Sequence, residues 1–230
     1  MNNSIMIAVE GADKAGKHTQ VMKIMDYLQK QNIACETLDF PQYGAFFGKV
    51  VKNYLNGSYG GIHDLPSEYS MLPYALDRLQ HQKIIKEWLD SGKWVILDRY
   101  SYSNLYSVAK HPESEWDSKI QYLEEMEFSQ LGILRPNYNI YLYLDPKIAY
   151  DMRAAGLKSY QNGRPDIHES NFKLLRDVSK CYRLVAQRDP SHWMIVDEME
   201  SGKRLTIDEV FERIKPKLDE FIVKSKTRQQ

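Results

Sequence analysis

A glycine-containing turn between an apolar strand and an amphipathic helix is the feature that most limits how this chain can fold. Residues 4–11, "SIMIAVEG", are mostly apolar on both faces, which predicts a strand buried inside a sheet. Residues 17–31 place Val21, Ile24 and Leu28 at helical spacing, which predicts an amphipathic helix. A strand, a tight turn and a helix in this order are typical of an α/β domain with a mostly parallel sheet.

The turn itself, "GADKAGK", fits the pattern G-x-x-x-x-G-K of a P-loop. Its glycines let the backbone curl so that several N–H groups point at phosphate oxygens, and the helix start adds a positive dipole end. Lys17 adds a full charge against the β- and γ-phosphates. The alternative is a strand-to-helix turn that only happens to carry a lysine. The strand and helix on either side favour a P-loop, whose expected ATP-binding residues are Gly11, Ala12, Asp13, Lys14, Ala15, Gly16, Lys17, His18 and Thr19.

His18 stands where such loops usually carry Ser or Thr, whose hydroxyl oxygen is a hard ligand for Mg²⁺. Imidazole suits softer metals better. Three explanations are open: water replaces the hydroxyl on a Mg²⁺ held by a carboxylate and the triphosphate, Thr19 takes the hydroxyl's place, or metal-dependent catalysis is impaired. We favour the first, because Mg²⁺ commonly keeps several waters and needs few protein ligands.

Strand and helix patterns alternate along the remaining sequence. Further strands are predicted at residues 34–41, 93–100, 138–146 and 192–197. Helices are predicted at residues 46–57, 67–92, 117–130, 149–156, 167–189 and 206–226. Ser67 is a candidate N-cap of the helix predicted at residues 67–92. Pro73 either moves the start of that helix or kinks it. We expect one domain over residues 1–230: a three-layer α/β/α P-loop fold with a five-stranded parallel sheet surrounded by helices, and a mobile lid at about residues 156–166.

A charged pair, Asp98 and Arg99, follows a buried strand in "VILDRY". Ligands of open α/β sheets bind outside the carboxyl ends of the strands, and the P-loop lies at the same edge. Asp98 is therefore a candidate for holding Mg²⁺ through a bound water, and Arg99 for clamping a phosphate with two hydrogen bonds. The alternative is an ion pair that only closes the end of the strand.

The composition excludes several classes of protein. The formal net charge of zero argues against a nucleic-acid polymer as partner, because such binders usually carry a basic excess. The N-terminal segment has no signal-peptide pattern, and no run approaches the roughly 20 apolar residues of a membrane helix, so we expect a cytoplasmic protein that does not bind membranes. Cys35 and Cys181 lack metal-ligand spacing and are expected to be free thiols.

Five sequence blocks together resemble the thymidylate kinase family, the P-loop kinases that phosphorylate dTMP. In chain order these blocks are "EGADKAGKHTQ", "FPQYGAFFGKVVKNYLNG", "LPYALDRLQH", "LDRYSYSN" and "DIHESNFKLLRDVSKCYRLVA". Each block alone is weak, whereas five in the family's order and spacing are highly specific. The resemblance implies strand order 2-3-1-4-5, ATP as phosphoryl donor, Mg²⁺ as cofactor and a homodimer.

The resemblance also implies roles for residues that match its motifs. Asp13 matches an acid that approaches the sugar 3′-hydroxyl of the acceptor, and Lys14 stands where some members carry a catalytic Arg. Tyr74 matches an aromatic residue that stacks on thymine, Arg78 an arginine that contacts the base, and Arg99 the arginine that positions the acceptor phosphate. The expected acceptor-binding residues are Asp13, Phe40, Tyr43, Tyr74, Arg78, Arg99, Ser103, Asn104, Tyr106 and Ser107, and the expected catalytic residues are Lys14, Lys17, Asp98 and Arg99.

In the segment that resembles the family's lid, Lys158 and Arg164 are the cations that would close over ATP, and Arg164 is counted among the ATP-binding residues. Solvated loop charges are the alternative. Asp166, His168 and Glu169 match a stretch expected to anchor the lid or to cap the following helix.

Two further departures from the family concern the acceptor. After Pro41 many members carry an Arg that holds the acceptor phosphate, whereas this chain has Gln42 and Tyr43. Ser107 stands near the family's usual Gln, in a segment that is one residue shorter. We expect transfer of the ATP γ-phosphoryl group to dTMP. A kinase with another or broader acceptor, and a catalytically weakened nucleotide-binding subunit, are the alternatives.

Overall fold

The computed structural model describes residues 4–154 and 171–227. The expected lid at 156–166 lies outside these residues, and so do Lys158, Arg164, Asp166, His168 and Glu169. In the described part of the chain, no helix is both long and apolar enough to cross a bilayer. Cys35 and Cys181 are free thiols, as predicted.

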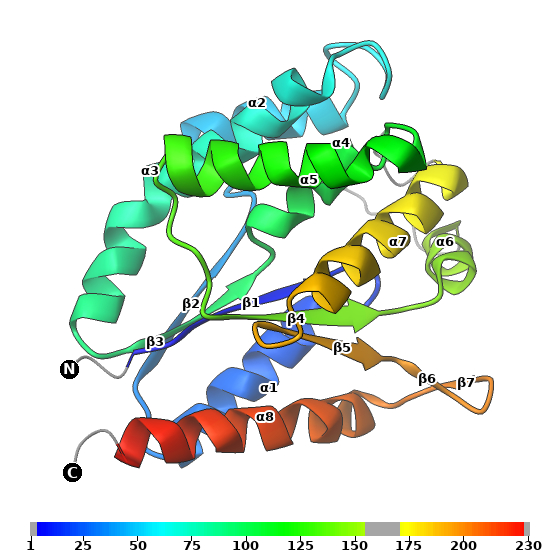
Figure 1. Cartoon of the computed structure of the whole chain (residues 1–230). Coiled ribbons are helices and arrows are strands. Elements are labelled where there is room, and N and C mark those ends of the chain that lie inside the picture. Colours follow the sequence, from blue (N-terminus) through cyan, green and yellow to red (C-terminus); the bar gives the residue numbers. More distant parts are fainter. Residues whose placement is uncertain (1–3, 155–170, 228–230) are drawn as a thin grey trace.

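A five-stranded parallel sheet forms the centre of the molecule, with strand order β2-β3-β1-β4-β5 (Figure 1). The prediction of a parallel sheet in the order 2-3-1-4-5 is therefore confirmed. A short antiparallel hairpin, β6–β7, stands apart from the sheet. The strands are β1 (Met6–Gly11), β2 (Cys35–Asp39), β3 (Trp94–Asp98), β4 (Tyr138–Tyr143), β5 (Trp193–Asp197), β6 (Met199–Glu200) and β7 (Lys203–Arg204).

Helices connect the parallel strands, because each parallel pair needs a crossover connection that is usually an α-helix. The α-helices are α1 (Lys17–Lys30), α2 (Phe46–Leu55), α3 (Ser67–Asp90), α4 (Leu105–Val108), α5 (Trp116–Glu124), α6 (Pro146–Ala154), α7 (Phe172–Arg188) and α8 (Ile207–Thr227). Short helical turns are η1 (Ser101–Asn104), η2 (Glu113–Glu115) and the π-helical η3 (Glu125–Gln130).

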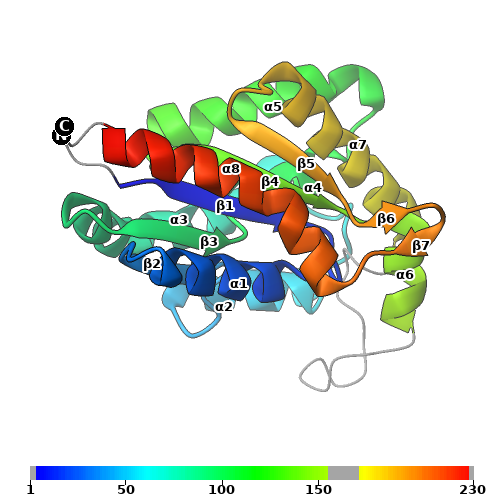
Figure 2. The same ribbon diagram turned by 90° about the horizontal axis from the view of Figure 1, so that it is seen from below.

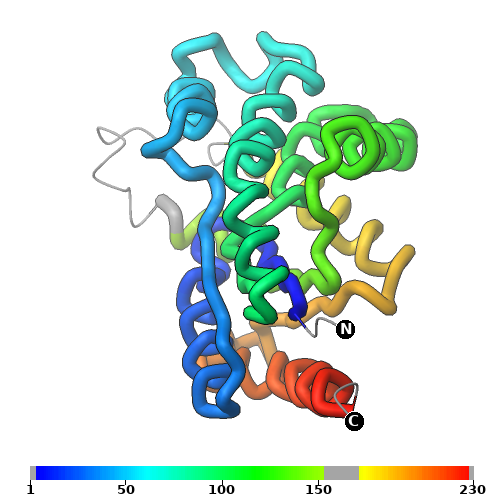
Figure 3. Tube along the Cα trace, turned by 90° about the vertical axis from the view of Figure 1, so that its left-hand side faces the viewer, coloured from blue at the N-terminus to red at the C-terminus, as the bar shows by residue number. Residues whose placement is uncertain are grey.

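The helices form two layers, one on each face of the sheet (Figures 1 and 2). The period of two along a strand sends Ile7 and Val9 of β1 into the core beneath α1 and α8, and Met6 and Ala8 into the core beneath α3. In the side view of Figure 3, α1 and α8 lie together at the bottom of the molecule and α2 lies near its top. The predicted three-layer architecture is confirmed.

Helix ends differ from the sequence predictions at a few places. Helix α3 runs without interruption from Ser67 to Asp90 and contains Pro73, so the helix does not begin near that proline. Ser67 does not cap it: Pro66 holds the N-cap position, and the Ser67 hydroxyl lies 2.7 Å from Nε2 of His111. The helix predicted from residue 167 has its first described turn at Phe172, capped by the side chain of Asn171.

Candidate active site

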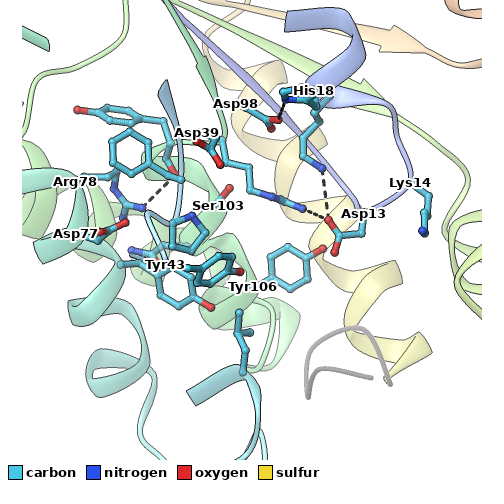
Figure 4. A pocket seen from close by; sticks show the side chains of 18 of the residues that line it. Asp13, Lys14, His18, Asp39, Tyr43, Asp77, Arg78, Asp98, Ser103 and Tyr106 are labelled. Atoms are coloured by element: carbon cyan, nitrogen blue, oxygen red, sulfur yellow. Dashed lines mark hydrogen bonds and ion pairs between the residues drawn. The ribbon is translucent and has the colours of Figure 1, made fainter. Parts of the chain in front are cut away.

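A cavity of about 380 Å³ opens at the carboxyl ends of β1, β2 and β3 and extends between α2, α3 and α4. This is the edge at which ligands of open α/β sheets bind. In Figure 4 the labelled side chains Asp13, Lys14 and His18 lie toward one end of the cavity, and Asp77 and Arg78 toward the other. We call the first the P-loop end, comprising Asp13, Lys17, Asp98 and Arg99, and the second the helix end, comprising Tyr74, Arg78, Asn104 and Ser107.

Two glycines give the P-loop its shape. Gly11 and Gly16 have φ angles of 154° and 67°, which glycine adopts far more easily than other residues. A Cβ on Gly11 would stand 2.7 Å from the carbonyl oxygen of Leu142 in the neighbouring strand. Gly16 is the N-cap of α1 and contributes no side-chain cap, so the first N–H groups of this helix remain for an anion.

Lys17 is held inside the loop. Its side chain is almost fully buried, its Nζ donates a hydrogen bond of 2.8 Å to the Ala12 carbonyl, and Nζ lies 3.6 Å from Oδ1 of Asp13. Burial, together with the positive charge of Arg99, lowers the pKa of Lys17 to about 8, although Asp13, Asp98 and Glu10 oppose this shift. Burial disfavours the charged form of Lys17, and the negative charge of a phosphate group bound here would favour it again.

Arg99 reaches the same carboxylate from the other side. It follows β3 with a φ of 68°, a left-handed conformation that is uncommon for a residue other than glycine. Its Nη1 donates to the Gly11 carbonyl at 3.0 Å, and its Nη2 donates to Oδ1 of Asp13. Lys17 and Arg99 therefore converge on Asp13, and two cations face one small region of the P-loop end.

Asp98 lies beside a second carboxylate. The parallel register pairs Asp98 with Asp39 of β2, and both side chains line the cavity. Nδ1 of His18 lies 3.7 Å from Oδ2 of Asp98, and the His18 side chain is 77% exposed. Carboxylate oxygens are hard ligands, so Asp98 fits a Mg²⁺ ion or one of its waters. The His18 ring is placed against this carboxylate rather than in the loop interior.

A buried ion pair supports the helix end. The Arg78 guanidinium donates to Glu127 through Nε at 3.0 Å and Nη2 at 2.5 Å, and through Nη1 to the Tyr100 carbonyl at 3.3 Å. Both side chains are essentially inaccessible to solvent. Asn104 donates to the same Glu127 carboxylate at 2.7 Å. Within the described residues, three of the five Arg78 N–H groups have hydrogen-bond partners, and Glu127 fixes both Arg78 and Asn104.

Behind Ser107 lies a second polar network. The Ser107 Oγ lies 2.9 Å from Oγ of Ser70. The Ser70 hydroxyl accepts a hydrogen bond of 3.0 Å from Nζ of Lys110. Lys110 also donates to the Tyr54 hydroxyl at 2.8 Å. Burial lowers the pKa of Lys110 to about 8. In the segments that the structure describes, no carboxylate pairs with Lys110; two hydroxyl groups accept its hydrogen bonds, and its Nζ lies 5.3 Å from the centroid of the Tyr54 ring.

Gln42, which follows Pro41, turns away from the cavity. Its Nε2 donates to the carbonyl and to Oδ1 of Asp39 at 2.6 and 2.7 Å, and its backbone N–H donates to Asp77 at 2.8 Å. Gln42 is not among the cavity-lining residues, whereas Tyr43 is. The side chain therefore fixes the segment between β2 and α2 instead of supplying a phosphate ligand.

A second, open hollow lies on the far side of the P-loop. Glu198, Arg204 and Leu205, which belong to the stretch after β5, face the P-loop across it. Gly16 and Thr19 line both the hollow and the cavity, so the two spaces meet at the P-loop. Arg204 ties the sides together by donating to the Lys14 carbonyl at 2.6 Å and to Glu198 at 2.7 Å.

The structure brings the expected site residues together. All expected acceptor-binding residues line the cavity: Asp13, Phe40, Tyr43, Tyr74, Arg78, Arg99, Ser103, Asn104, Tyr106 and Ser107. Of the expected ATP-binding residues, those that line it are Asp13, Lys14, Gly16, Lys17, His18 and Thr19. Ala15 lines the second hollow, Gly11 and Ala12 form the start of the loop, and Arg164 lies outside the described residues.

Three acidic residues of the site were missed. Asp39 and Asp77 line the cavity, and Glu10 lies fully buried directly before the P-loop. Two of them left a readable signal. Glu10 is the only charge in an otherwise apolar strand segment, and Asp39 ends a strand at the sheet edge where ligands bind. Asp77 lay inside a helical pattern and left no such signal.

Comparison with known proteins agrees with this geometry. The thymidylate kinase family profile matches residues 9–214. Thymidylate kinase of Mycobacterium tuberculosis is 30% identical over 197 residues, which cover 84% of this chain and 91% of that protein. The Plasmodium falciparum thymidylate kinase is 25% identical over 219 residues, covering 94% of this chain and 93% of the relative.

A solved structure of thymidylate kinase from Candida albicans superposes with a TM-score of 0.71 at 23% identity, and covers 94% of this chain and 91% of its own. This match supports the fold, while the family profile and the 30% identical relative span most of the sequence. The chain belongs to the thymidylate kinase family.

Proposed function

We propose that this protein transfers the γ-phosphoryl group of ATP to dTMP, giving ADP and dTDP. The observation that best supports the proposal is the convergence of Lys17 and Arg99 on Asp13, where the cavity and the second hollow meet. One nucleotide in each space would bring two phosphate chains end to end at these two cations. Membership of the thymidylate kinase family selects dTMP as the acceptor.

Phosphoryl transfer needs alignment and countercharge more than covalent help from the protein. Lys17 and the P-loop N–H groups hold the β- and γ-phosphates, and Arg99 holds the acceptor phosphate. The side chain of Lys14 stands apart from that of Asp13 in Figure 4, and its proposed role is to reach the transferred group from the loop. The acceptor phosphate is itself the nucleophile, so no strong general base is required.

The helix end receives the thymine base. Tyr74 offers an aromatic face for stacking, and Phe40, Tyr43 and Tyr106 add aromatic walls. Arg78 and Asn104, held by Glu127, supply N–H donors at fixed positions. At the opposite end, Asp13 approaches the sugar 3′-hydroxyl. Ser103 and Ser107 complete the wall between base and sugar.

Asp98 is the proposed holder of Mg²⁺, through a metal-bound water. The donor set fits, because Asp98 and Asp39 place two carboxylates side by side at the P-loop end. A Mg²⁺ ion bound there with ATP would neutralise part of the phosphate charge. The role of Asp98 is to orient that hydrated ion, and His18 braces Asp98 from the solvent side.

The wider setting is also proposed. Residues 1–230 act as a single kinase domain, working as a homodimer in the cytoplasm on small nucleotides. The neutral net charge supports the absence of nucleic-acid polymers among its partners.

ADP release coupled to NADH oxidation, at fixed ATP and Mg²⁺, tests the function. We expect dTMP to give the highest kcat/KM among dTMP, dUMP, other monophosphates and thymidine. A Lys17→Met variant serves as the background control. A faster reaction with another monophosphate would assign a different acceptor. No acceptor-dependent ADP release would leave a nucleotide-binding subunit without kinase activity.

A further inference from the structure

Glu10 is a fully buried carboxylate that the proposed reaction does not use. It precedes Gly11, the first residue of the P-loop, at the end of β1. Three groups donate to it: the backbone N–H of Tyr100 at 2.9 Å, the hydroxyl of Ser103 at 2.7 Å and the hydroxyl of Tyr182 at 2.9 Å. Burial raises the pKa of Glu10, whereas these hydrogen bonds and the charge of Arg99 lower it.

Two of these donors lie on the segment that presents Arg99. The Arg99 N–H donates to the Val9 carbonyl at 2.9 Å, and the next N–H, that of Tyr100, donates to Glu10. The Arg99 guanidinium donates to the Gly11 carbonyl at 3.0 Å. Three consecutive residues at the end of β1 therefore hold both the backbone and the side chain of Arg99.

Such support is needed, because Arg99 has a left-handed φ of 68°. Residues other than glycine keep this conformation only where the surrounding contacts fix it. A main-chain carbonyl contributes to the fixing in any sequence, whereas the bond to the Tyr100 N–H depends on the Glu10 side chain. The same carboxylate binds Ser103, which lines the cavity.

We propose that Glu10 is a positioning residue for the acceptor: its carboxylate holds residues 99–103 so that Arg99 and Ser103 face the acceptor nucleotide. This inference rests on the proposed function. Glu10 does not touch either nucleotide, and it acts through the geometry of its hydrogen bonds rather than through chemistry of its own. Tyr182 fixes the carboxylate from α7, where its ring stacks on Tyr141 with centroids 4.5 Å apart.

Two conservative variants separate geometry from charge. Glu10→Gln keeps the side-chain length and an oxygen for the Tyr100 N–H, and its amide can donate to the Ser103 hydroxyl. Glu10→Asp keeps the charge but withdraws the carboxylate by one methylene. We expect Glu10→Asp to lower kcat/KM for dTMP by about ten- to a hundredfold, the scale set by a misplacement of about 1 Å, and Glu10→Gln to stay within about threefold.

Calorimetry with a non-hydrolysable ATP analogue, and with dTMP in its presence, gives a second readout. Glu10→Asp is expected to weaken dTMP binding at least about fivefold while the analogue binds within about threefold of the parent protein. In an Arg99→Ala background the Glu10→Asp effect on dTMP binding should fall to less than about twofold, because the residue being positioned has gone. Tyr138→Phe is the matched control: it removes a buried tyrosine hydrogen bond to the Trp193 carbonyl, outside the cavity, and should change dTMP binding less than about threefold.

Several results would overturn the inference. They are unchanged dTMP kinetics in Glu10→Asp, damage in Glu10→Gln without damage in Glu10→Asp, and an equal Glu10→Asp effect with and without Arg99. Glu10→Ala replaces the Asp variant if that variant does not fold, and unfolding of both would make Glu10 a folding residue instead. Failure of the unaltered protein to bind dTMP would reject the proposed function separately.

Discussion

The P-loop end of the cavity is built on the backbone, whereas the helix end is built on layers of side chains. At the P-loop end, Lys17 and Arg99 bond to the carbonyls of Ala12 and Gly11, and the loop glycines adopt left-handed conformations. At the helix end, Arg78 is held by the carboxylate of Glu127.

This difference decides which contacts of the site a single substitution can remove. The main-chain carbonyls that hold Lys17 and Arg99 are present in any sequence, so most of the phosphate site follows from the loop geometry, and Glu10 is the side chain that adds to it. Groups fixed by Glu127, Ser70 and Lys110 depend on residues that a single substitution replaces. We expect substitutions at the P-loop end to change turnover, and substitutions behind the helix end to change stability and acceptor selection.

The largest expected effect tests the P-loop end. Arg99→Ala should lower kcat with dTMP by about 10²–10³-fold, because a preorganised cation facing the transferred phosphoryl group is lost. Affinity for a non-hydrolysable ATP analogue should stay within about twofold, since Lys17 and the loop N–H groups remain. Arg135→Ala, an exposed arginine outside the cavity, is the control. Near-normal turnover of Arg99→Ala would remove this residue from the mechanism.

The second prediction tests the helix end. Glu127→Gln leaves the Arg78 guanidinium buried without its countercharge, which should lower the free energy of unfolding by about 3–5 kcal/mol. Urea denaturation measures this loss, and the rate ratio for dTMP over dUMP should fall because Arg78 and Asn104 lose their common partner. Asp90→Asn, which breaks an exposed pair with Lys86 on α3, should leave stability nearly unchanged. Equal stability losses in the two variants would contradict the assignment.

The third prediction uses the lowered pKa of Lys17, about 8 in the free protein. Below this pH the ammonium is present before ATP arrives, so binding needs no added proton. Above it Lys17 is mostly neutral, and the triphosphate must draw a proton onto it, because bound phosphates raise its pKa. Affinity for an ATP analogue should therefore fall by up to about tenfold per pH unit above pH 8.

Calorimetry between pH 7.5 and 9.5, in two buffers of different ionisation enthalpy, measures this proton uptake directly. Lys17→Arg is the control, since a guanidinium stays charged over the whole range. Should the parent protein bind the analogue equally well at both ends of this range, Lys17 would be fully charged in the free site and the cause assigned to its pKa would be wrong.

The backbone-built end is also the part that the sequence predicted best. Apolar runs located the strands, and the spacing of Gly11, Gly16 and Lys17 located the loop, because both depend on short stretches of chain. The Asp98–Arg99 pair could be placed at the same edge since carboxyl ends of parallel strands meet there. These features need only local spacing and the rules of parallel sheets.

The side-chain layers could not be predicted in the same way. The Glu10–Tyr182 bond joins residues 172 positions apart, and the Arg78–Glu127 pair joins residues 49 apart. Periodicity places such a residue on one face of its helix or strand, but it does not identify the element that packs against that face. Gln42 shows the same limit: its place after Pro41 does not reveal that its side chain bonds to Asp39 and its backbone N–H to Asp77.

His18 is the exception within the P-loop end, because its position depends on a side chain, and it carries the smallest expected effect. Its exposed ring lies 3.7 Å from Asp98 and fixes no backbone. His18→Ser, which restores a hydroxyl oxygen, should lower the Mg²⁺ concentration for half-maximal activity by about two- to fivefold, while kcat changes less.

His18→Ala separates the two contributions of this position, since it removes the imidazole without adding a hydroxyl. We expect its Mg²⁺ dependence to stay close to that of the parent protein, because water already fills the hydroxyl's place. Titration of the ATP-analogue complex with Mn²⁺, followed by electron paramagnetic resonance, reports metal binding without turnover. A large loss of metal affinity in His18→Ala would make the imidazole a ligand, and the P-loop end would then depend on a side chain as much as the helix end does.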